Sequence, residues 1–302
     1  MAMKPDVLRS KLHGVIAFPV TPFKPDLSLD VAALRQNMRV MLRHPLAAIV
    51  APGGTGEIYS LTAAEHLEIV HVAVEEAAGQ VPVLAGAAFN PAMAVQLATQ
   101  AAGAGADGIL AFPSYYPHAE SEGVLDYYRA IGDATGLGLL IYARDWFHPD
   151  PRTVERLTSI ETLIAWKDGQ GDIRRLQAIM QRVGDRLLWI GGAGDDMVPA
   201  YYALGIRTFT SSIANHAPGL SLQLHEAASN GDAARLKTLM HDTVLPLYAL
   251  RGRRKGYEVS VMKALMDLLG LRGGPVRPPL VMPKPEEIEE LRAMLPRWRG
   301  VD

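Results

Sequence analysis

The chain has 302 residues, of which 49% are apolar and 21% are charged, with no cysteine and a formal net charge of −2. This composition predicts a folded globular protein, and it excludes a disulfide scaffold, a cysteine-ligated zinc or iron–sulfur site and a thiol nucleophile. The near-neutral charge argues against nucleic-acid binding, and no membrane span is expected because no apolar run reaches 18 residues.

Eight short apolar runs follow one another at intervals of roughly 27 residues, which suits a strand, a helix and two loops. The runs are continuously apolar, as expected for parallel strands that are covered on both faces. We predict strands at GVIAF from Gly14, AAIVAP from Ala47, VPVLAGA from Val81, DGILAFP from Asp107, GLLIYA from Gly138, LIAWK from Leu163, LLWIGG from Leu187 and RTFTSS from Arg207.

Helical patterns lie between and after these runs. They predict helices at 30–42, 62–78, 92–104, 172–183 and 195–204, then around His225 and at 236–250, 258–269 and 286–295. Eight βα units predict a (β/α)8 TIM barrel, an α/β fold. The barrel core is expected over residues 1–217, and residues 218–302 should hold the last barrel helix and a C-terminal helical extension. A doubly wound sheet is the alternative, but no GxGxxG follows a strand.

One lysine stands out by its position. The chain has eight lysines and 22 arginines, and Lys167 is the only lysine between Lys24 and Lys237. It ends the sixth predicted strand, where barrel enzymes place catalytic groups. A desolvated lysine can lose its proton and attack a carbonyl, whereas arginine cannot. We therefore favour a nucleophilic Lys167 over a structural ion pair or a solvated charge.

Two further strand ends carry candidate groups. The segment 53–57, GGTGE, lets the backbone approach a ligand closely, and its N–H groups can bind a carboxylate. It could equally be an ordinary turn in which Glu57 starts a helix. The fifth strand ends in YARD, where Tyr142 can act as acid or base if a cation lowers its pKa, and Arg144 can bind a carboxylate. Alternatively, Tyr142 caps the core and Arg144 pairs with Asp145.

Together these segments resemble the Schiff-base lyases of the dihydrodipicolinate synthase and N-acetylneuraminate lyase superfamily. The resemblance runs from GVIAFPVTPF at Gly14 through GGTGE, PSYY at 113–116 and GAGDD from Gly192 to the helical tail. Within the superfamily, the chain is most similar to the 5-dehydro-4-deoxyglucarate dehydratases. This similarity lies in GGTGE, YARD, WKDGQGD at 166–172 and the tail RRKGYEVSVMKAL with GGPVRPPL. Ala143 in place of their Asn, and the synthase-like Gly194-Asp195-Asp196, depart from that pattern.

The resemblance implies dehydration and decarboxylation of 5-dehydro-4-deoxyglucarate, a six-carbon keto diacid, to 2,5-dioxopentanoate. Lys167 would form an iminium with the ketone. The iminium accepts electrons in both the dehydration and the decarboxylation, so no metal or bound cofactor is needed. Tyr142 and Thr55 would relay protons, and Tyr115 would extend the relay within the chain or from a neighbouring subunit.

The resemblance also implies a set of substrate-binding residues. The near carboxylate should lie on the Gly54–Thr55 backbone, and the distal carboxylate should meet Arg144, which could instead order its loop. Hydroxyls at the end of the eighth strand would bind substrate hydroxyls, or hydrogen-bond their own loop. The full set is Gly54, Thr55, Arg144, Asp145, Gly194, Thr210 and Ser211.

The remaining polar residues predict little chemistry. The nine histidines show no metal-site spacing, although His148 and His216 fall near strand ends. The basic run 251–255 is more typical of a solvated helix end or a subunit contact than of an anion site. The expected partners are a small-molecule keto acid and further copies of the chain, as a dimer or tetramer. The N-terminal residues lack a signal-peptide pattern, so a cytoplasmic location is expected.

Two other functions fit the same pattern. One is another class I aldolase, lyase or synthase of the superfamily, acting on pyruvate or a related 2-keto acid. The other is a catalytically silent ligand-binding member.

Overall fold

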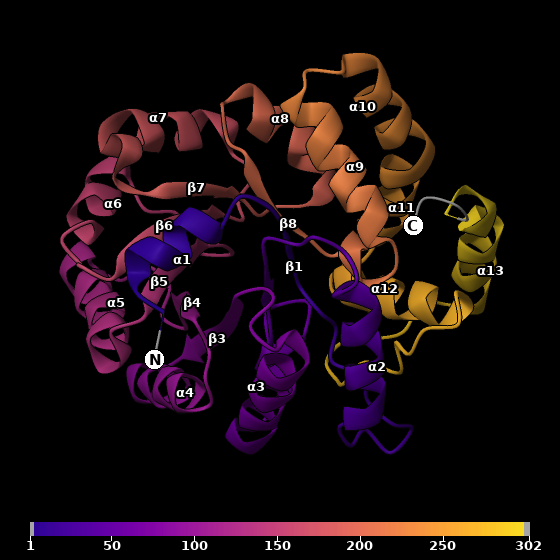
Figure 1. The fold of residues 1–302 in the computed structure, drawn as a ribbon, viewed down its shortest axis with the longest axis horizontal. Coiled ribbons are helices and arrows are strands. Elements are labelled where there is room, and N and C mark those ends of the chain that lie inside the picture. Colours follow the sequence, from indigo (N-terminus) through magenta and orange to yellow (C-terminus); the bar gives the residue numbers. More distant parts are fainter. Residues whose placement is uncertain (1–2, 299–302) are drawn as a thin grey trace.

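Eight parallel strands form a closed barrel in the computed structural model, which describes residues 3–298. Each strand pairs with the next and β8 pairs with β1, and helices surround the ring (Figure 1). The (β/α)8 prediction is confirmed, and the doubly wound alternative is wrong. The strands are β1 Gly14–Ala17, β2 Ala48–Val50, β3 Val83–Phe89, β4 Gly108–Ser114, β5 Gly138–Ala143, β6 Leu163–Asp168, β7 Leu188–Gly191 and β8 Thr208–Ser211.

The helices between the strands begin where the sequence supplies capping groups. The Asp30 side chain accepts a hydrogen bond from the backbone N–H of Ala33, and Thr62 and Glu65 form the predicted capping box. The helices of the barrel are α1 Pro5–Lys11, α2 Val31–Met41, α3 Ala63–Ala77, α4 Pro91–Gly103, α5 Ser121–Thr135, α6 Pro151–Leu157, α7 Ile173–Val183, α8 Val198–Ala203 and α9 Pro218–Ser229.

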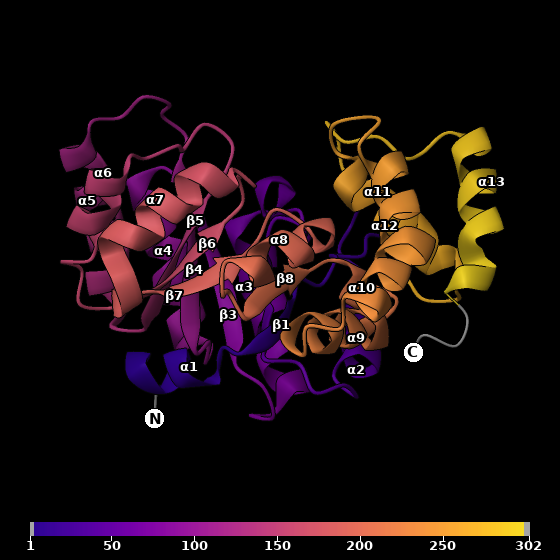
Figure 2. The ribbon, with the colours of Figure 1, turned by 90° about the horizontal axis from the view of Figure 1, so that it is seen from above.

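Up to residue 298, four α-helices follow the barrel: α10 Ala233–Leu239, α11 Leu245–Arg251, α12 Tyr257–Leu268 and α13 Pro285–Met294. The single helix predicted at 236–250 is wrong in detail, since a π-helical segment at Met240–Val244 separates α10 from α11. Figure 2 shows these helices gathered at one side of the barrel. Across residues 3–298, none of the helices combines the length and apolar character that a membrane crossing requires.

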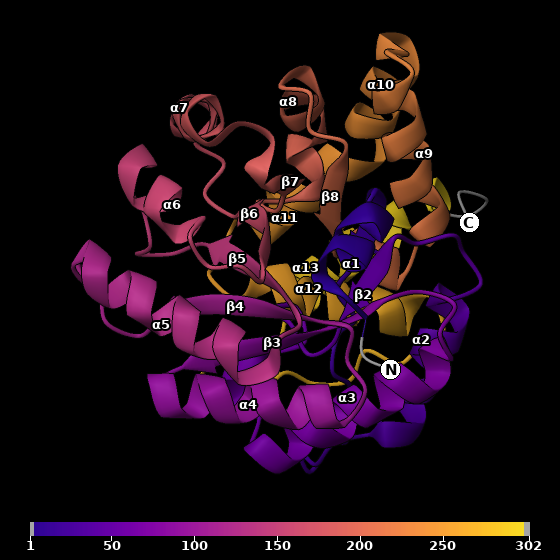
Figure 3. The same cartoon turned by 60° about the vertical axis from the view of Figure 1, so that its left-hand side comes forward.

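Helix α1 closes the amino-terminal end of the strands. Its Leu8 side chain is fully buried in the apolar cluster inside the barrel, and α1 contacts β5 and β6 (Figure 3). A Cβ atom on Gly138, the first residue of β5, would lie 2.9 Å from Leu8 Cδ2, so glycine makes room for this contact. With this end filled, the opposite, carboxyl end of the strands is the one left open to a ligand.

Candidate active site

A cavity of about 340 Å³ opens at the carboxyl ends of the strands. Its wall combines the ends of β5, β6 and β8, the segment after β7, the loop after β2, and helices α11 and α12. Among the predicted site residues, those lining it are Gly54, Thr55, Tyr142, Arg144, Asp145, Lys167, Gly194, Thr210 and Ser211.

Lys167 lies in the wall of this cavity with only 3% of its surface exposed. Its Nζ donates to the Gly192 carbonyl oxygen at 3.2 Å and lies 3.0 Å from the centre of the Tyr142 ring. Burial lowers the pKa of Lys167 well below its ordinary value, and the nearby Arg144 guanidinium lowers it further. A Cβ atom on Gly192 would lie 2.5 Å from Lys167 Cγ, so glycine leaves space for the lysine stem.

Tyr142 is held beside Lys167 by strand register, because these two residues pair directly between β5 and β6. Its hydroxyl donates to the Gly192 carbonyl oxygen at 3.4 Å, the same acceptor that Lys167 uses. Burial raises the pKa of Tyr142, while Arg144 acts in the opposite direction. The lowered pKa that the sequence pattern requires for an acid or base role of Tyr142 is therefore not found, and the phenol keeps its proton at neutral pH.

The glycine-rich loop presents free backbone donors to the cavity. Within residues 3–298, the N–H groups of Gly54 and Thr55 and the Thr55 hydroxyl make no hydrogen bond. Two hydrogen bonds fold the loop back on itself, from Glu57 N–H to the Gly54 carbonyl and from Ile58 N–H to the Gly53 carbonyl. Donors arranged in this way suit a carboxylate.

Glu57 does more than start a helix, because its buried carboxylate ties this loop to the C-terminal helices. It is fully buried, and its Oε1 lies 2.5 Å from Nζ of Lys263 on α12, which is also fully buried. Its Oε2 accepts from the backbone N–H of Arg277 at 3.0 Å. The link could not be predicted, because residues 206 positions apart give no local signal.

Arg144 reaches back toward the glycine-rich loop. A Cβ atom on Gly54 would lie 2.8 Å from Arg144 Nη1, and the guanidinium stands over the Tyr142 ring at 5.3 Å. Arg144 Nε also donates to Asp145 Oδ2 at 2.6 Å. Ala143, between Tyr142 and Arg144, is buried in the outer core and does not line the cavity.

The two predicted hydroxyls on β8 differ in their availability. The Ser211 Oγ donates to Asp195 Oδ1, shares a hydrogen bond with Ser221 at 2.8 Å and accepts from the Ala214 N–H. This saturated hydroxyl does not fit the predicted contact with a substrate hydroxyl, because no donor or lone pair is left for it. Thr210 lines the cavity, and its hydroxyl makes no hydrogen bond within the described residues.

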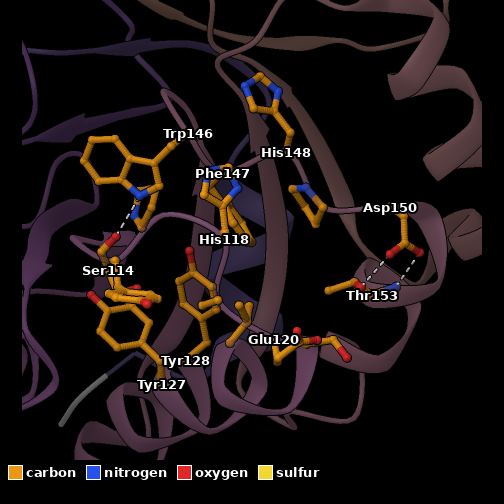
Figure 4. A pocket seen from close by; sticks show the side chains of 16 residues that line it. Ser114, His118, Glu120, Tyr127, Tyr128, Trp146, Phe147, His148, Asp150 and Thr153 are labelled. Carbon is orange, nitrogen blue, oxygen red and sulfur yellow. Dashed lines mark hydrogen bonds between the residues drawn. The ribbon is translucent and has the colours of Figure 1, made fainter.

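Tyr115 does not reach this cavity within one chain. Its side chain is 79% exposed and packs edge-on against Trp146 at 5.7 Å. Its chain neighbours Ser114 and Tyr116 line a second cavity of about 480 Å³, between the β4–α5 and β5–α6 segments, where Trp146 Nε1 donates to the Ser114 carbonyl (Figure 4). His148 lines this second cavity, and His216 is buried against Trp298, so neither lines the Lys167 cavity.

The cavity is also lined by residues that were not predicted to belong to the site. Arg251 and Lys255, from the basic run expected to be solvated or at a subunit contact, both line it. Tyr248 joins them, and its hydroxyl donates to Asp195 Oδ2 at 2.8 Å. The basic run can be recognised in the sequence, but only the folded chain shows that Arg251 and Lys255 line the cavity of Lys167. Among the described residues, no group of three acidic or histidine side chains could hold a metal ion.

Comparisons with known proteins agree with the fold and identify the family. The Dihydrodipicolinate synthetase family matches residues 11–297. A "Probable 5-dehydro-4-deoxyglucarate dehydratase" of Bradyrhizobium diazoefficiens is 40% identical over 95% of this chain and 93% of its own. A protein of the same name from Ralstonia nicotianae is 39% identical over 95% of this chain and 94% of its own.

Solved structures agree with this similarity. The dihydrodipicolinate synthase of Bacillus clausii superposes with a TM-score of 0.91 at 27% identity, over 97% of this chain and 99% of that one. A sialic acid aldolase of Ruminococcus gnavus shares the fold, with a TM-score of 0.89 at 20% identity. From the matched family and the relatives together, this chain belongs to the dihydrodipicolinate synthetase family.

Proposed function

We propose that this chain is a Schiff-base lyase that converts 5-dehydro-4-deoxyglucarate to 2,5-dioxopentanoate, with loss of water and carbon dioxide. Its family and its relatives make it an enzyme of the lyase type. The observation that carries the proposal is Lys167, a buried amine with a lowered pKa that contacts the ring of Tyr142 in an open cavity. A lowered pKa favours loss of the proton, and the neutral amine of a lysine is a nucleophile toward a ketone.

The proposed reaction begins at the ketone of the substrate. The Lys167 amine adds to the carbonyl carbon, and loss of water gives an iminium. A proton then leaves the adjacent methylene, and the neighbouring hydroxyl departs as water, which leaves a conjugated iminium. The bond to the far carboxylate breaks next, carbon dioxide leaves, and its electron pair moves to the iminium nitrogen. Protonation and hydrolysis release the product and restore the amine.

Tyr142 and Thr55 are the proposed proton carriers. The Tyr142 phenol remains protonated at neutral pH, so it can pass a proton on while it accepts another. The unpaired Thr55 hydroxyl lies in the same cavity. Tyr115 is 79% exposed on its own chain, and we propose that it extends this relay in a neighbouring subunit of a dimer or tetramer.

The near carboxylate of the substrate is proposed to lie on the N–H groups of Gly54 and Thr55. Arg144 borders Gly54, so we propose that it neutralises this carboxylate and, through its pair with Asp145, orders the loop. Thr210 and the Gly194 backbone are proposed to contact the substrate hydroxyls. Ser211 is proposed to act indirectly, by holding Asp195.

Borohydride trapping with the keto diacid, followed by peptide mass analysis, tests the proposal. We expect an adduct at Lys167, together with release of carbon dioxide and 2,5-dioxopentanoate in a coupled assay. Lys167→Ala should remove both signals, whereas Lys237→Ala, at an exposed lysine of α10, should keep both. Absence of an adduct with every 2-keto acid would disprove the Schiff-base chemistry.

A second candidate, an aldolase or synthase acting on pyruvate and an aldehyde, is supported by the 27% identical dihydrodipicolinate synthase. Carbon–carbon bond formation from pyruvate, without release of carbon dioxide from the diacid, would favour it. A silent ligand-binding member would keep its ligand affinity in Lys167→Ala and show no activity in either form.

A further inference from the structure

The C-terminal helices place a guanidinium with two unpaired nitrogens in the wall of the Lys167 cavity. Arg251 is the last residue of α11, and its Nε and Nη1 are buried without a hydrogen-bond partner within residues 3–298. Its one hydrogen bond there is a long one, from Nη2 to the Glu258 carbonyl oxygen at 3.4 Å. Buried donors of a charged group that lack an acceptor are costly, so this arrangement suits a site that a ligand completes.

The carboxylates near Arg251 do not satisfy it. None of the ion pairs in the described part of the chain includes Arg251, so each carboxylate there is more than 4.0 Å away. The two carboxylate oxygens of Asp195 are used by Ser211 and by the Tyr248 hydroxyl. The Glu258 carboxylate accepts from the Gly256 N–H at 2.9 Å.

The position of the guanidinium is fixed by an aromatic ring. Arg251 Cζ lies 4.2 Å from the centre of the Tyr248 ring, a cation–π distance. Tyr248 is held in turn, because its hydroxyl accepts from the Asp195 N–H at 2.6 Å and donates to the Asp195 carboxylate. Arg251 is therefore held ready before a ligand arrives, and binding costs little side-chain entropy.

The two arginines of the cavity stand on different sides of Lys167. Arg144 belongs to the β5 side, where it borders Gly54 and already pairs with Asp145. Arg251 belongs to the β7 side, because its partner Tyr248 packs against Gly194, whose Cβ atom would lie 2.7 Å from Tyr248 Cε1. Strand β6, with Lys167, lies between β5 and β7 in the barrel.

From this geometry we infer that Arg251 binds the distal carboxylate of a keto diacid whose ketone is attached to Lys167, with the exposed Lys255 adding positive charge at the mouth. The inference rests on the proposed function and deepens it. The distal carboxylate would then be bound by a residue outside the barrel, and not by Arg144 as the family resemblance implies. The planar fork of arginine can hold both oxygens of that carboxylate.

Trapping with two matched 2-keto acids tests the inference without turnover. The probes are 2-oxoadipate, which has a distal carboxylate, and 2-oxohexanoate, which has the same chain length and none. In the unmodified protein, 2-oxoadipate should half-saturate borohydride trapping at a concentration about ten- to a hundredfold lower. Arg251→Gln should remove most of this preference and leave trapping with 2-oxohexanoate unchanged.

A control variant and the dehydration assay separate the possible outcomes. Arg254→Gln, in the same basic run but outside the cavity wall, should keep the preference for 2-oxoadipate. An unchanged preference in Arg251→Gln would overturn the inference, and so would an equal loss of trapping for both probes, which a merely structural role predicts. If the preference depends on Arg251 but the dehydration assay fails, the subsite stands and the proposed reaction is wrong.

Discussion

Lys263 of α12 and Glu57 of the glycine-rich loop form an ion pair in which both side chains are fully buried, with Nζ 2.5 Å from Oε1. Lys263 also donates to the Pro275 carbonyl oxygen at 2.8 Å. These contacts join the C-terminal helix α12 to the glycine-rich loop through a buried ion pair. Removal of one partner leaves a buried charge without its counter-ion, whereas removal of both leaves none.

Lys263→Met should lower the free energy of unfolding by about 3–5 kcal/mol, because Glu57 then remains buried and unpaired. The double variant Lys263→Met/Glu57→Gln should recover part of this loss. Urea unfolding followed by circular dichroism measures both. Lys237→Met, at an exposed position, is the control and should change little. A single variant as stable as the unmodified protein would show that the pair contributes nothing.

The pH dependence of trapping should report the lowered pKa of Lys167. The neutral amine is the nucleophile, so the rate of trapping with pyruvate rises as pH passes the lysine pKa. Because burial and Arg144 lower that pKa, the rise should be complete well below pH 10.5, the ordinary value. Arg144→Gln should move the rise to higher pH, since one source of the lowering is gone. A rise that continues to pH 10.5 in the unmodified protein would contradict the prediction.

Lys167 should destabilise the folded state at neutral pH. Between the lowered folded pKa and the ordinary value of 10.5, the unfolded chain binds more protons than the folded one, so stability rises with pH. Lys167→Met should therefore raise the thermal midpoint at pH 7, and the gain should shrink toward pH 10.5. Calorimetry at both pH values, with Lys237→Met alongside, measures this. A lower midpoint at pH 7 would show that Lys167 stabilises the fold.

Tyr142→Phe should separate adduct formation from elimination. The ring that contacts Lys167 remains, so trapping with pyruvate should persist, while loss of the phenolic proton carrier should slow dehydration by about 10²–10⁴-fold. Tyr128→Phe is a suitable control, because this buried tyrosine lies outside the Lys167 cavity. Equal dehydration rates in Tyr142→Phe and the unmodified protein would remove Tyr142 from the relay.

Gly54→Ala should weaken substrate binding. The added Cβ atom would lie 2.8 Å from Arg144 Nη1, so the guanidinium must move from the proposed carboxylate site. We expect the KM for keto acids to rise about tenfold or more with a smaller change in kcat, as lost binding energy predicts. Gly103→Ala, where a Cβ atom meets nothing within 4 Å, should leave the KM unchanged. The same KM in both variants would argue against a carboxylate at Gly54.

The barrel could be predicted from the sequence because its signals are local. Each strand is a short apolar run, and Thr62 and Glu65 specify a helix start within four residues. The inward position of Tyr142 beside Lys167 follows from strand ends meeting at one face. The roles of Ser211 and Glu57 could not be predicted, since they depend on Asp195 and Lys263, which only folding brings to them.

The position of Arg251 could not be predicted from the sequence either. Its basic neighbours in the sequence indicate solvent, and Arg253 indeed pairs with Glu290 at the surface. Arg251 differs only because α11 turns it toward Tyr248 and the cavity. The order of charges along the chain does not indicate which way the Arg251 side chain points from α11.

The link between Glu57 and α12 also bears on biosynthesis. A ribosome completes all eight strands, and Lys167 with them, some fifty residues before it adds Lys263. Until then the Gly54 loop lacks its buried counter-ion, and Arg251 is absent for most of that interval. The proposed nucleophile is therefore synthesised before the residues that are proposed to select its substrate.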